Sequence, residues 1–161
     1  MAMPVEQGAQ LFAEIQRLAD RIAISELLDR YAELFDDRTF TATLPTLFTE
    51  DANVELPPGD HHGIEGMDAF HADVMSPFGA TQHIFTNYLI DLADNRADFR
   101  AKTLVTHHVP PSSPKSGDAH DFFVAGGLLT GAVTRTPDGW RFRQVLLDVI
   151  WRQGDFGPGP G

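Results

Sequence analysis

The chain has 161 residues, of which 42% are apolar, and this length fits one domain with a buried core. Its 12 basic and 23 acidic residues give a net charge of -11, so its surface repels phosphate backbones and nucleic-acid binding is not expected. It contains no cysteine, which excludes a disulfide framework and a thiol nucleophile.

The sequence carries no signal for export or membrane insertion. Residues 1–10 lack the basic and apolar regions of a secretory signal. The longest apolar stretches have the length of a strand rather than of a bilayer span. We therefore expect a cytoplasmic protein with no membrane partner, and the lack of cysteine fits a reducing compartment.

Helical periodicity dominates the first half of the chain. Residues 11–35 carry apolar side chains at three- and four-residue spacing, which predicts a long helix with a candidate interruption at Ala19–Asp20. A short second helix is predicted over residues 41–48, with Pro45 in its first turn. A third helix is predicted over residues 66–75.

Strand patterns dominate the second half of the chain. A polar turn at residues 93–95 and a turn with proline and glycine at residues 136–139 each separate two long apolar-rich segments. We therefore expect two long hairpins, preceded by a shorter strand. The predicted strands cover residues 52–56, 82–92, 96–109, 122–135 and 140–152.

Helices followed by a long antiparallel sheet predict an α+β fold. We expect a single domain over residues 1–153, with a loop rich in Pro, Ser and Gly at residues 110–120. Residues 154–161 alternate Gly and Pro and predict an irregular tail. A sheet that curls around a helix encloses a cone, and such concave sites usually hold small molecules.

Two polar residues stand in apolar surroundings. Asp36 follows the apolar stripe of the first predicted helix, and His83 begins a largely apolar strand. A carboxylate and an imidazole that enter one apolar interior are the usual components of a proton-transfer site. The alternative is a residue of the last helical turn for Asp36 and a hydrogen-bonded strand residue for His83.

Four segments together resemble a known family. They are YAELFDDRTF at residues 31–40, QHIFTN at 82–87, DGWRF at 138–142 and DVIW at 148–151. The chain thereby resembles the scytalone dehydratase, SnoaL-like polyketide cyclase and bile-acid dehydratase branch of the nuclear-transport-factor-like superfamily, over residues 18–153. The resemblance implies a cone-shaped α+β barrel with N-terminal helices packed in a curved, mostly antiparallel sheet. It also implies a homo-oligomer, a trimer or a dimer.

The resemblance implies roles for several side chains. His83 would be the general acid and base, oriented by Asp36, and Tyr31 would donate a hydrogen bond to a substrate oxygen. For Tyr31 an ordinary core aromatic is the equal alternative. A second histidine would come from the next strand, as His107 or His108. Side-chain alternation places His107 inside, whereas an ungapped comparison with scytalone dehydratase favours His108. A β-bulge would turn His108 inward in place of His107, so both residues remain candidates.

Five further residues are candidates for substrate binding. Phe35 and Leu56 stand where scytalone dehydratases carry pocket tyrosines, and Thr130 stands where they carry an asparagine. The missing tyrosines at Phe35 and Leu56 count against scytalone itself as the substrate. Asn87 and Phe85 share the alternating face of His83, so both would reach a ligand. The alternative for Asn87 is a buried amide satisfied by the backbone, and for Phe85 it is ordinary core packing.

The seven histidines raise the question of a metal site. His61, His62 and His71 do not form a recognised ligand spacing, and His61 and His62 fall in a segment that predicts an exposed turn. There is no phosphate-binding loop and no nucleophile elbow. We therefore expect neither a metal nor a cofactor.

The residues and the resemblance together predict an enzyme. We expect a cofactor-independent lyase, a dehydratase, with an isomerase or cyclase as the second choice. The substrate would be a small apolar carbonyl compound of the polyketide or steroid type. The alternative is a non-catalytic module that binds a small molecule in the same cone-shaped pocket.

Overall fold

The computed structural model describes residues 5–111 and 122–154. Most of the predicted loop at 110–120 and all but the first residue of the predicted tail lie outside the described residues. In chain order the elements are α1 (Val5–Asp37), α2 (Phe40–Leu47), β1 (Phe48–Leu56), β2 (Gly59–His62), α3 (Met67–Met75), β3 (Thr81–Ala93), β4 (Arg96–His108), β5 (Phe122–Thr136) and β6 (Gly139–Gln153).

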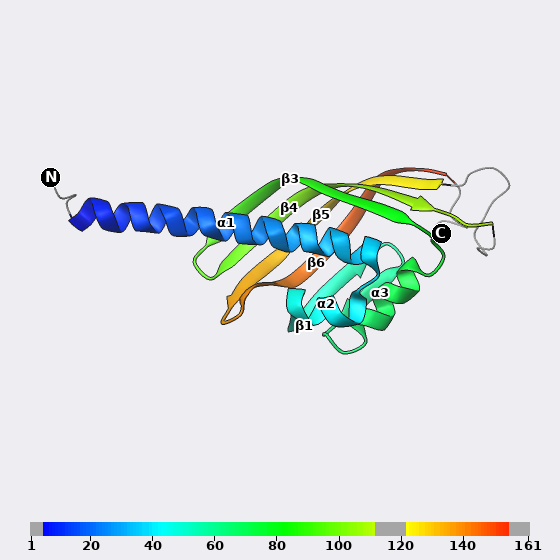
Figure 1. The fold of residues 1–161 in the computed structure, drawn as a ribbon, viewed down its shortest axis with the longest axis horizontal. Coiled ribbons are helices and arrows are strands. Elements are labelled where there is room, and N and C mark those ends of the chain that lie inside the picture. Colours follow the sequence, from blue (N-terminus) through cyan, green and yellow to red (C-terminus); the bar gives the residue numbers. More distant parts are fainter. Residues whose placement is uncertain (1–4, 112–121, 155–161) are drawn as a thin grey trace.

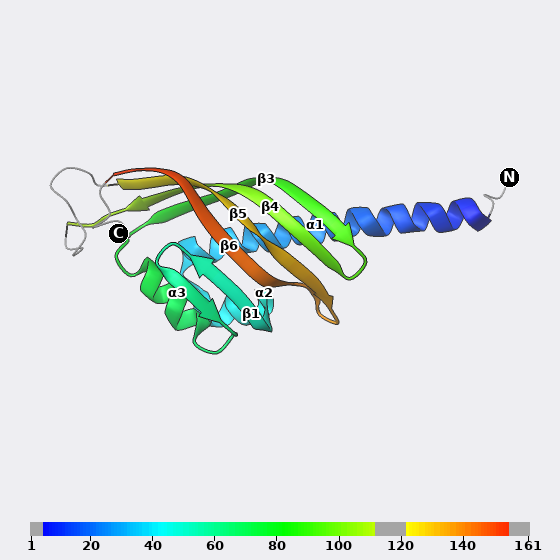
Figure 2. The ribbon, with the colours of Figure 1, turned by 180° about the vertical axis from the view of Figure 1, so that it is seen from behind.

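The strands form one curved sheet in the order β2-β1-β6-β5-β4-β3 (Figure 1). β1 runs parallel to β6, and all other neighbours are antiparallel. β3 with β4 and β5 with β6 make the two predicted hairpins. α1 lies along the concave side of the sheet, and α2 and α3 pack beside β1 (Figure 2). This confirms the predicted α+β cone, although β2 and β3 are left as edges of an open sheet.

Helix α1 is continuous for 33 residues, so the candidate interruption at Ala19–Asp20 does not occur. The buried Asp20 is satisfied instead, because its carboxylate accepts hydrogen bonds from Arg135 at 2.5 Å and from the Trp140 indole N–H at 3.2 Å. A buried carboxylate with such partners does not need a break in the helix to reach water. The helix therefore enters the core without changing direction.

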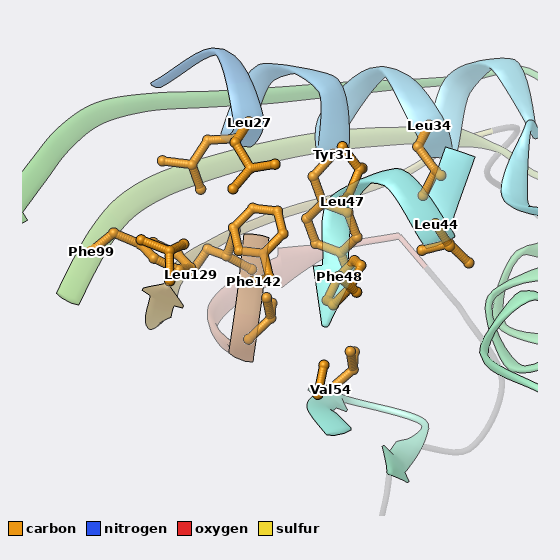
Figure 3. Packing of buried hydrophobic residues seen from close by; sticks show 14 of the residues in the cluster. Leu27, Tyr31, Leu34, Leu44, Leu47, Phe48, Val54, Phe99, Leu129 and Phe142 are labelled. Atoms are coloured by element: carbon orange, nitrogen blue, oxygen red, sulfur yellow. The ribbon is translucent and has the colours of Figure 1, made fainter. Parts of the chain in front are cut away.

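The core lies between the C-terminal half of α1 and the inner face of the sheet (Figure 3). Tyr31 occupies its centre and contacts the rings of Phe35, Phe48 and Phe142 at centroid distances of 5.0 to 5.4 Å. Each such aromatic side chain stabilises the fold by about 1.5–3 kcal/mol through burial. This apolar layer leads directly to the C-terminal end of α1, where the polar site lies.

Two expectations for the first half need correction. Residues 59–62, which include His61 and His62, form the edge strand β2 rather than an irregular turn, because Pro57 and Pro58 make a two-residue connection that pairs β2 with β1. His62 is exposed, whereas His61 is half-buried against Phe70. Pro45 lies in the second turn of α2 rather than in its first, and the helix ends two residues later.

Candidate active site

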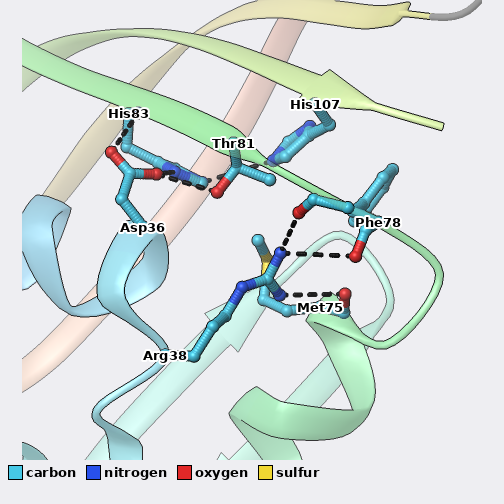
Figure 4. A network of polar contacts seen from close by, with 8 residues as sticks. Asp36, Arg38, Met75, Phe78, Thr81, His83 and His107 are labelled. Carbon is cyan, nitrogen blue, oxygen red and sulfur yellow. Dashed lines mark hydrogen bonds and ion pairs between the residues drawn. The ribbon is translucent and has the colours of Figure 1, made fainter. Parts of the chain in front are cut away.

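Asp36 and His83 meet where the end of α1 lies against the start of β3 (Figure 4). The His83 Nδ1–H donates to Asp36 Oδ1 at 2.7 Å. The His83 backbone N–H donates to Asp36 Oδ2 at 2.9 Å, and the Thr81 hydroxyl donates to Oδ1 at 2.8 Å. Three donors therefore hold the carboxylate in one orientation, and the carboxylate fixes the imidazole tautomer.

The ring of His83 is held by packing as well as by hydrogen bonds. Phe35, the residue before Asp36, stacks on the imidazole with a centroid distance of 4.9 Å and an interplanar angle of 21°. Phe85 meets the same ring edge-on at 6.5 Å. Only 6% of the His83 side chain is exposed, against 25% for Asp36. The imidazole is thus nearly dry while its carboxylate partner keeps some contact with water.

This environment keeps His83 neutral at physiological pH. Burial lowers the pKa of His83 below its ordinary value, the hydrogen bond and charge of Asp36 oppose that shift, and the charge of Arg38 adds to it. Because the proton of the neutral ring is on Nδ1, which donates a hydrogen bond to Asp36, Nε2 carries a lone pair. A neutral imidazole with an available lone pair can act as a general base.

The structure brings His107, and not His108, to His83. The two Nε2 atoms lie 3.3 Å apart, so the His107 Nε2–H donates to the His83 lone pair. β4 pairs with β5 without any register shift, so simple alternation holds and the bulge that would favour His108 is absent. His108 instead meets the ring of Phe122.

His107 is itself enclosed by aromatic rings. Phe78 stacks on it at 4.2 Å, and Phe123 lies at 5.8 Å. Burial, with the charges of His83 and Arg38 in the same direction, lowers the pKa of His107 to about 3. Its Nδ1 is buried and has no hydrogen-bond partner among the described residues. A buried polar atom of this kind indicates a site for a ligand or for chemistry.

Arg38 ties the site to the segment between α3 and β3. Its guanidinium donates to the carbonyl oxygens of Met75 at 2.9 Å and Gly79 at 2.8 Å, with a longer contact of 3.5 Å to that of Phe78. Arg38 adopts a left-handed backbone conformation, with φ of 57°, directly after α1. Sequence reasoning missed both Arg38 and Thr81. Main-chain carbonyls leave no pattern in a sequence, although Thr81 shares the alternating face of His83.

Comparison with known proteins identifies the family of this chain. The sequence matches the SnoaL-like domain family over residues 16–145. The chain belongs to this family. The resemblance expected from the sequence is thus confirmed for family and fold, and it supports a small-molecule-binding or catalytic domain. A comparison with curated proteins gives no match.

Three solved structures resemble this SnoaL-like domain. The Kfla4162 protein of Kribbella flavida is 25% identical, with a TM-score of 0.78 over 85% of this chain and 95% of that one. A candidate scytalone dehydratase of Novosphingobium aromaticivorans is 19% identical, with a TM-score of 0.75 and coverage of 89% and 92%. Hexachlorocyclohexane dehydrochlorinase LinA-type3 of Novosphingobium barchaimii is 17% identical, with a TM-score of 0.74 and coverage of 87% and 92%.

Tyr31 lies deeper in this SnoaL-like domain than the dyad. Its hydroxyl donates to His71 Nε2 at 3.0 Å, and the His71 Nδ1–H donates to the Met67 carbonyl at 2.8 Å. Burial raises the pKa of Tyr31, and burial lowers the pKa of His71 to about 4. Both groups are therefore neutral, and the Tyr31 hydroxyl is already engaged inside the core.

Two expected substrate contacts are not brought to the dyad. β3 has a register shift after Thr86, and Asn87 takes a left-handed conformation with φ of 56°, so its side chain leaves the alternating face and is exposed. Thr130 pairs with Arg100 and Leu146, which are both exposed, so it lies on the outer face of the sheet.

Phe35 and Leu56, the other two apolar candidates, lie in different parts of the domain. Phe35 stacks directly on the ring, as described above. Leu56 is buried at the end of β1 and also borders a surface hollow of about 590 Å³ formed with residues 55–60, Leu146 and Leu147. A second hollow, of about 340 Å³, is lined by Asn87, Tyr88, Leu89, Arg100 and Lys102. Neither of these two hollows is lined by His83 or Asp36.

Within residues 5–111 and 122–154, no three side chains of His, Asp or Glu come together as a metal-ligand set. No helix in these same two ranges is long and apolar enough to cross a membrane.

Proposed function

We propose that this protein is a cofactor-independent lyase that removes water from a small apolar carbonyl compound, with His83 as the general base. The observation that carries the proposal is the 2.7 Å contact between His83 Nδ1 and a carboxylate held by two further donors. This contact leaves Nε2 as the only basic atom of the ring. A base oriented in this way raises rates by about 100-fold to 10,000-fold.

The reaction begins with a proton transfer to His83. Nε2 takes a proton from the carbon next to the substrate carbonyl, and Asp36 stabilises the resulting imidazolium. The electron pair left on carbon forms the new double bond as the bond to a hydroxyl group one carbon further on breaks. The imidazolium returns its proton to that hydroxyl, which leaves as water, so His83 is regenerated.

His107 supplies a hydrogen-bond donor beside the reacting nitrogen. Its Nε2–H points at His83 Nε2 from 3.3 Å. In the complex the substrate takes the place of this contact, and the same N–H donates to the carbonyl oxygen as negative charge develops there. Preorganised donors of this kind commonly supply a large share of catalysis.

The surroundings of the ring support an apolar substrate. Phe35 and Phe85 flank His83, and Phe78 and Phe123 flank His107. The names of two structural neighbours, a candidate dehydratase and a dehydrochlorinase, both denote eliminations, in which a proton and a leaving group depart. For this chain that favours dehydration over isomerisation or cyclisation, which share the first step.

Turnover of a panel of hydroxylated polyketide and steroid ketones tests the proposal, with loss of water followed by mass spectrometry. We expect His83→Ala and Asp36→Asn each to lower kcat by about 100-fold or more, with far-ultraviolet circular dichroism unchanged. His108→Ala is the matched control, because His108 lies next to His107 on β4 and faces away from the dyad. Equal activity of all three variants with the wild type would contradict the mechanism.

A second candidate is a non-catalytic binding module, and one observation favours it. The His83 side chain is almost fully enclosed, and it lines neither of the two surface hollows described above. A module of this kind would bind an apolar ketone without converting it. Its affinity would also stay constant in His83→Ala and across the pH range in which His83 titrates, which calorimetry can measure.

A further inference from the structure

The first turns of α1 project beyond the sheet (Figures 1 and 2), and the contacts of residues 5–23 with the sheet include those of Asp20 with Arg135 and Trp140. Residues 5–23 would be about 27 Å long at the usual helical rise. Asp20 is the only buried residue among them. Six large apolar side chains on this segment are between 46% and 89% exposed, namely Val5, Leu11, Phe12, Ile15, Leu18 and Ile22.

Four of these side chains follow the spacing of a coiled-coil seam. Leu11, Ile15, Leu18 and Ile22 are separated by four, three and four residues, which is the alternation of d and a positions in a heptad. The core face of the same helix, formed by residues such as Ile24, Leu28 and Tyr31, lies on the opposite side. The seam is therefore a second apolar face, and the sheet does not cover it.

We propose that this seam pairs with the same seam of a second copy of the chain, with the two helices antiparallel. An antiparallel pair has a twofold axis between residues 16 and 17. Leu11 then faces Ile22 of the partner subunit, and Ile15 faces Leu18 of the partner subunit. Such a self-complementary contact closes as a dimer and leaves no further seam exposed.

The residues beside the seam complement one another in this orientation. Glu14 and Arg21 both occupy g positions, so Glu14 meets Arg21 of the partner subunit on each side of the axis. Neither residue forms an ion pair with another described residue of its own chain. On the other flank the large Phe12 meets the small Ala19 of the partner subunit, which fills space without overlap.

Charge favours the antiparallel orientation over the parallel one. Each chain carries a net charge of -11, and a parallel pair would set two acidic domains side by side. It would also place Asp29, the next a position, against Asp29 of the partner subunit. The antiparallel pair sends the two domains to opposite ends of the helices, so both repulsions are avoided.

Disulfide trapping tests the pairing and its direction, because the chain has no cysteine of its own. Leu11→Cys and Ile22→Cys chains are oxidised separately and as a mixture. We expect a linked dimer only in the mixture, since residue 11 is far from its own copy but opposite residue 22. A mixture of Gln10→Cys with Ile22→Cys is the control, and it should stay unlinked because Gln10 lies off the seam.

Other trapping results overturn the proposal. Linked dimers in each separate sample would show parallel pairing. No linked dimer in the mixture, or equal linking in the control, would show that the seams do not meet.

Sedimentation equilibrium tests the same contact without cysteines. Ile15→Asp with Leu18→Asp should halve the particle mass, whereas Ala9→Asp with Ala13→Asp, on the exposed opposite side of the helix, should leave it unchanged. Glu14→Arg should raise the dimer Kd by about tenfold, and adding Arg21→Glu should restore it. A wild type whose mass equals that of the Ile15→Asp, Leu18→Asp variant would overturn the proposal.

Discussion

Two buried histidines in this protein differ in the partners of their ring nitrogens. His71 is satisfied at both ring nitrogens, since Nδ1–H donates to a carbonyl and Nε2 accepts from Tyr31. His83 donates from Nδ1–H to Asp36, and its Nε2 accepts only a longer contact of 3.3 Å from His107, which a substrate can replace. Burial is the largest cause of a lowered pKa in both. An imidazole whose two ring nitrogens are both hydrogen-bonded inside the core stabilises the fold. An imidazole with a replaceable contact at one ring nitrogen can take part in chemistry.

The largest expected difference between the two histidines is in turnover. Asp36→Asn removes the negative charge and replaces one acceptor oxygen with an NH2 donor, so the His83 tautomer is no longer fixed and kcat falls by about 100-fold or more. His71→Asn removes a group that no proposed step uses, and kcat of the folded fraction should stay within about threefold. Steady-state kinetics on the same ketone, with the folded fraction known, measures both. A larger loss of kcat in His71→Asn than in Asp36→Asn would reverse the comparison.

The second difference is in how stability depends on pH. The folded pKa of His71 is about 4, below its unfolded value near 6.5, so the unfolded chain binds the proton first as pH falls. Stability therefore decreases between about pH 6.5 and pH 4, by on the order of 3 kcal/mol from this residue. Urea unfolding at several pH values should show that the unfolding free energy of His71→Asn falls less steeply over this pH range than that of the wild type. An equally steep dependence on pH in His71→Asn and in the wild type would contradict this role.

Local periodicity explains which parts of this fold were predictable. The stripe of α1 and the two hairpins follow from spacing and turn residues within short windows, and Asp36 and His83 stood out because they interrupt apolar patterns. The register shift after Thr86, which turns Asn87 outward, depends on pairing between strands and leaves no local signal. The choice between His107 and His108 depended on the same kind of information, because only the regular pairing of β4 decides it.

Buried polar partners were harder to predict than buried apolar ones. Tyr31 and His71 are 40 residues apart, and a histidine on a helix offers no indication that its ring will meet a tyrosine hydroxyl. The sequence raises His71 only as a metal ligand, and it leaves Tyr31 open between a substrate contact and a core aromatic. Arg38 was missed altogether because its partners are main-chain carbonyls. Such contacts are set by tertiary packing, which periodicity does not describe.

Tyr31→Phe separates a structural role from a catalytic one. The substitution leaves Nε2 of the buried His71 without a donor, which costs about 1–3 kcal/mol of unfolding free energy. Turnover should remain close to that of the wild type, because the hydroxyl faces His71 rather than His83. Tyr88→Phe, whose hydroxyl binds the exposed Asp29 and the Phe85 carbonyl, is the matched control and should cost less. A fall in kcat of about 100-fold in Tyr31→Phe, with stability unchanged, would return Tyr31 to the substrate pocket.

The smallest expected effect comes from Arg38, which acts on the dyad through charge and through the segment that carries Phe78. Its charge lowers the pKa of both His83 and His107, so Arg38→Met should move the acidic limb of the kcat/KM profile to higher pH. The carbonyls of Met75 and Gly79 would also lose their donor, which loosens the stacking of Phe78 on His107 and raises KM. Arg30→Met, at an exposed position on α1, is the control and should leave the profile in place. An acidic limb that stays in place in Arg38→Met would mean that the charge of Arg38 does not reach His83, and that the guanidinium serves only to hold the segment.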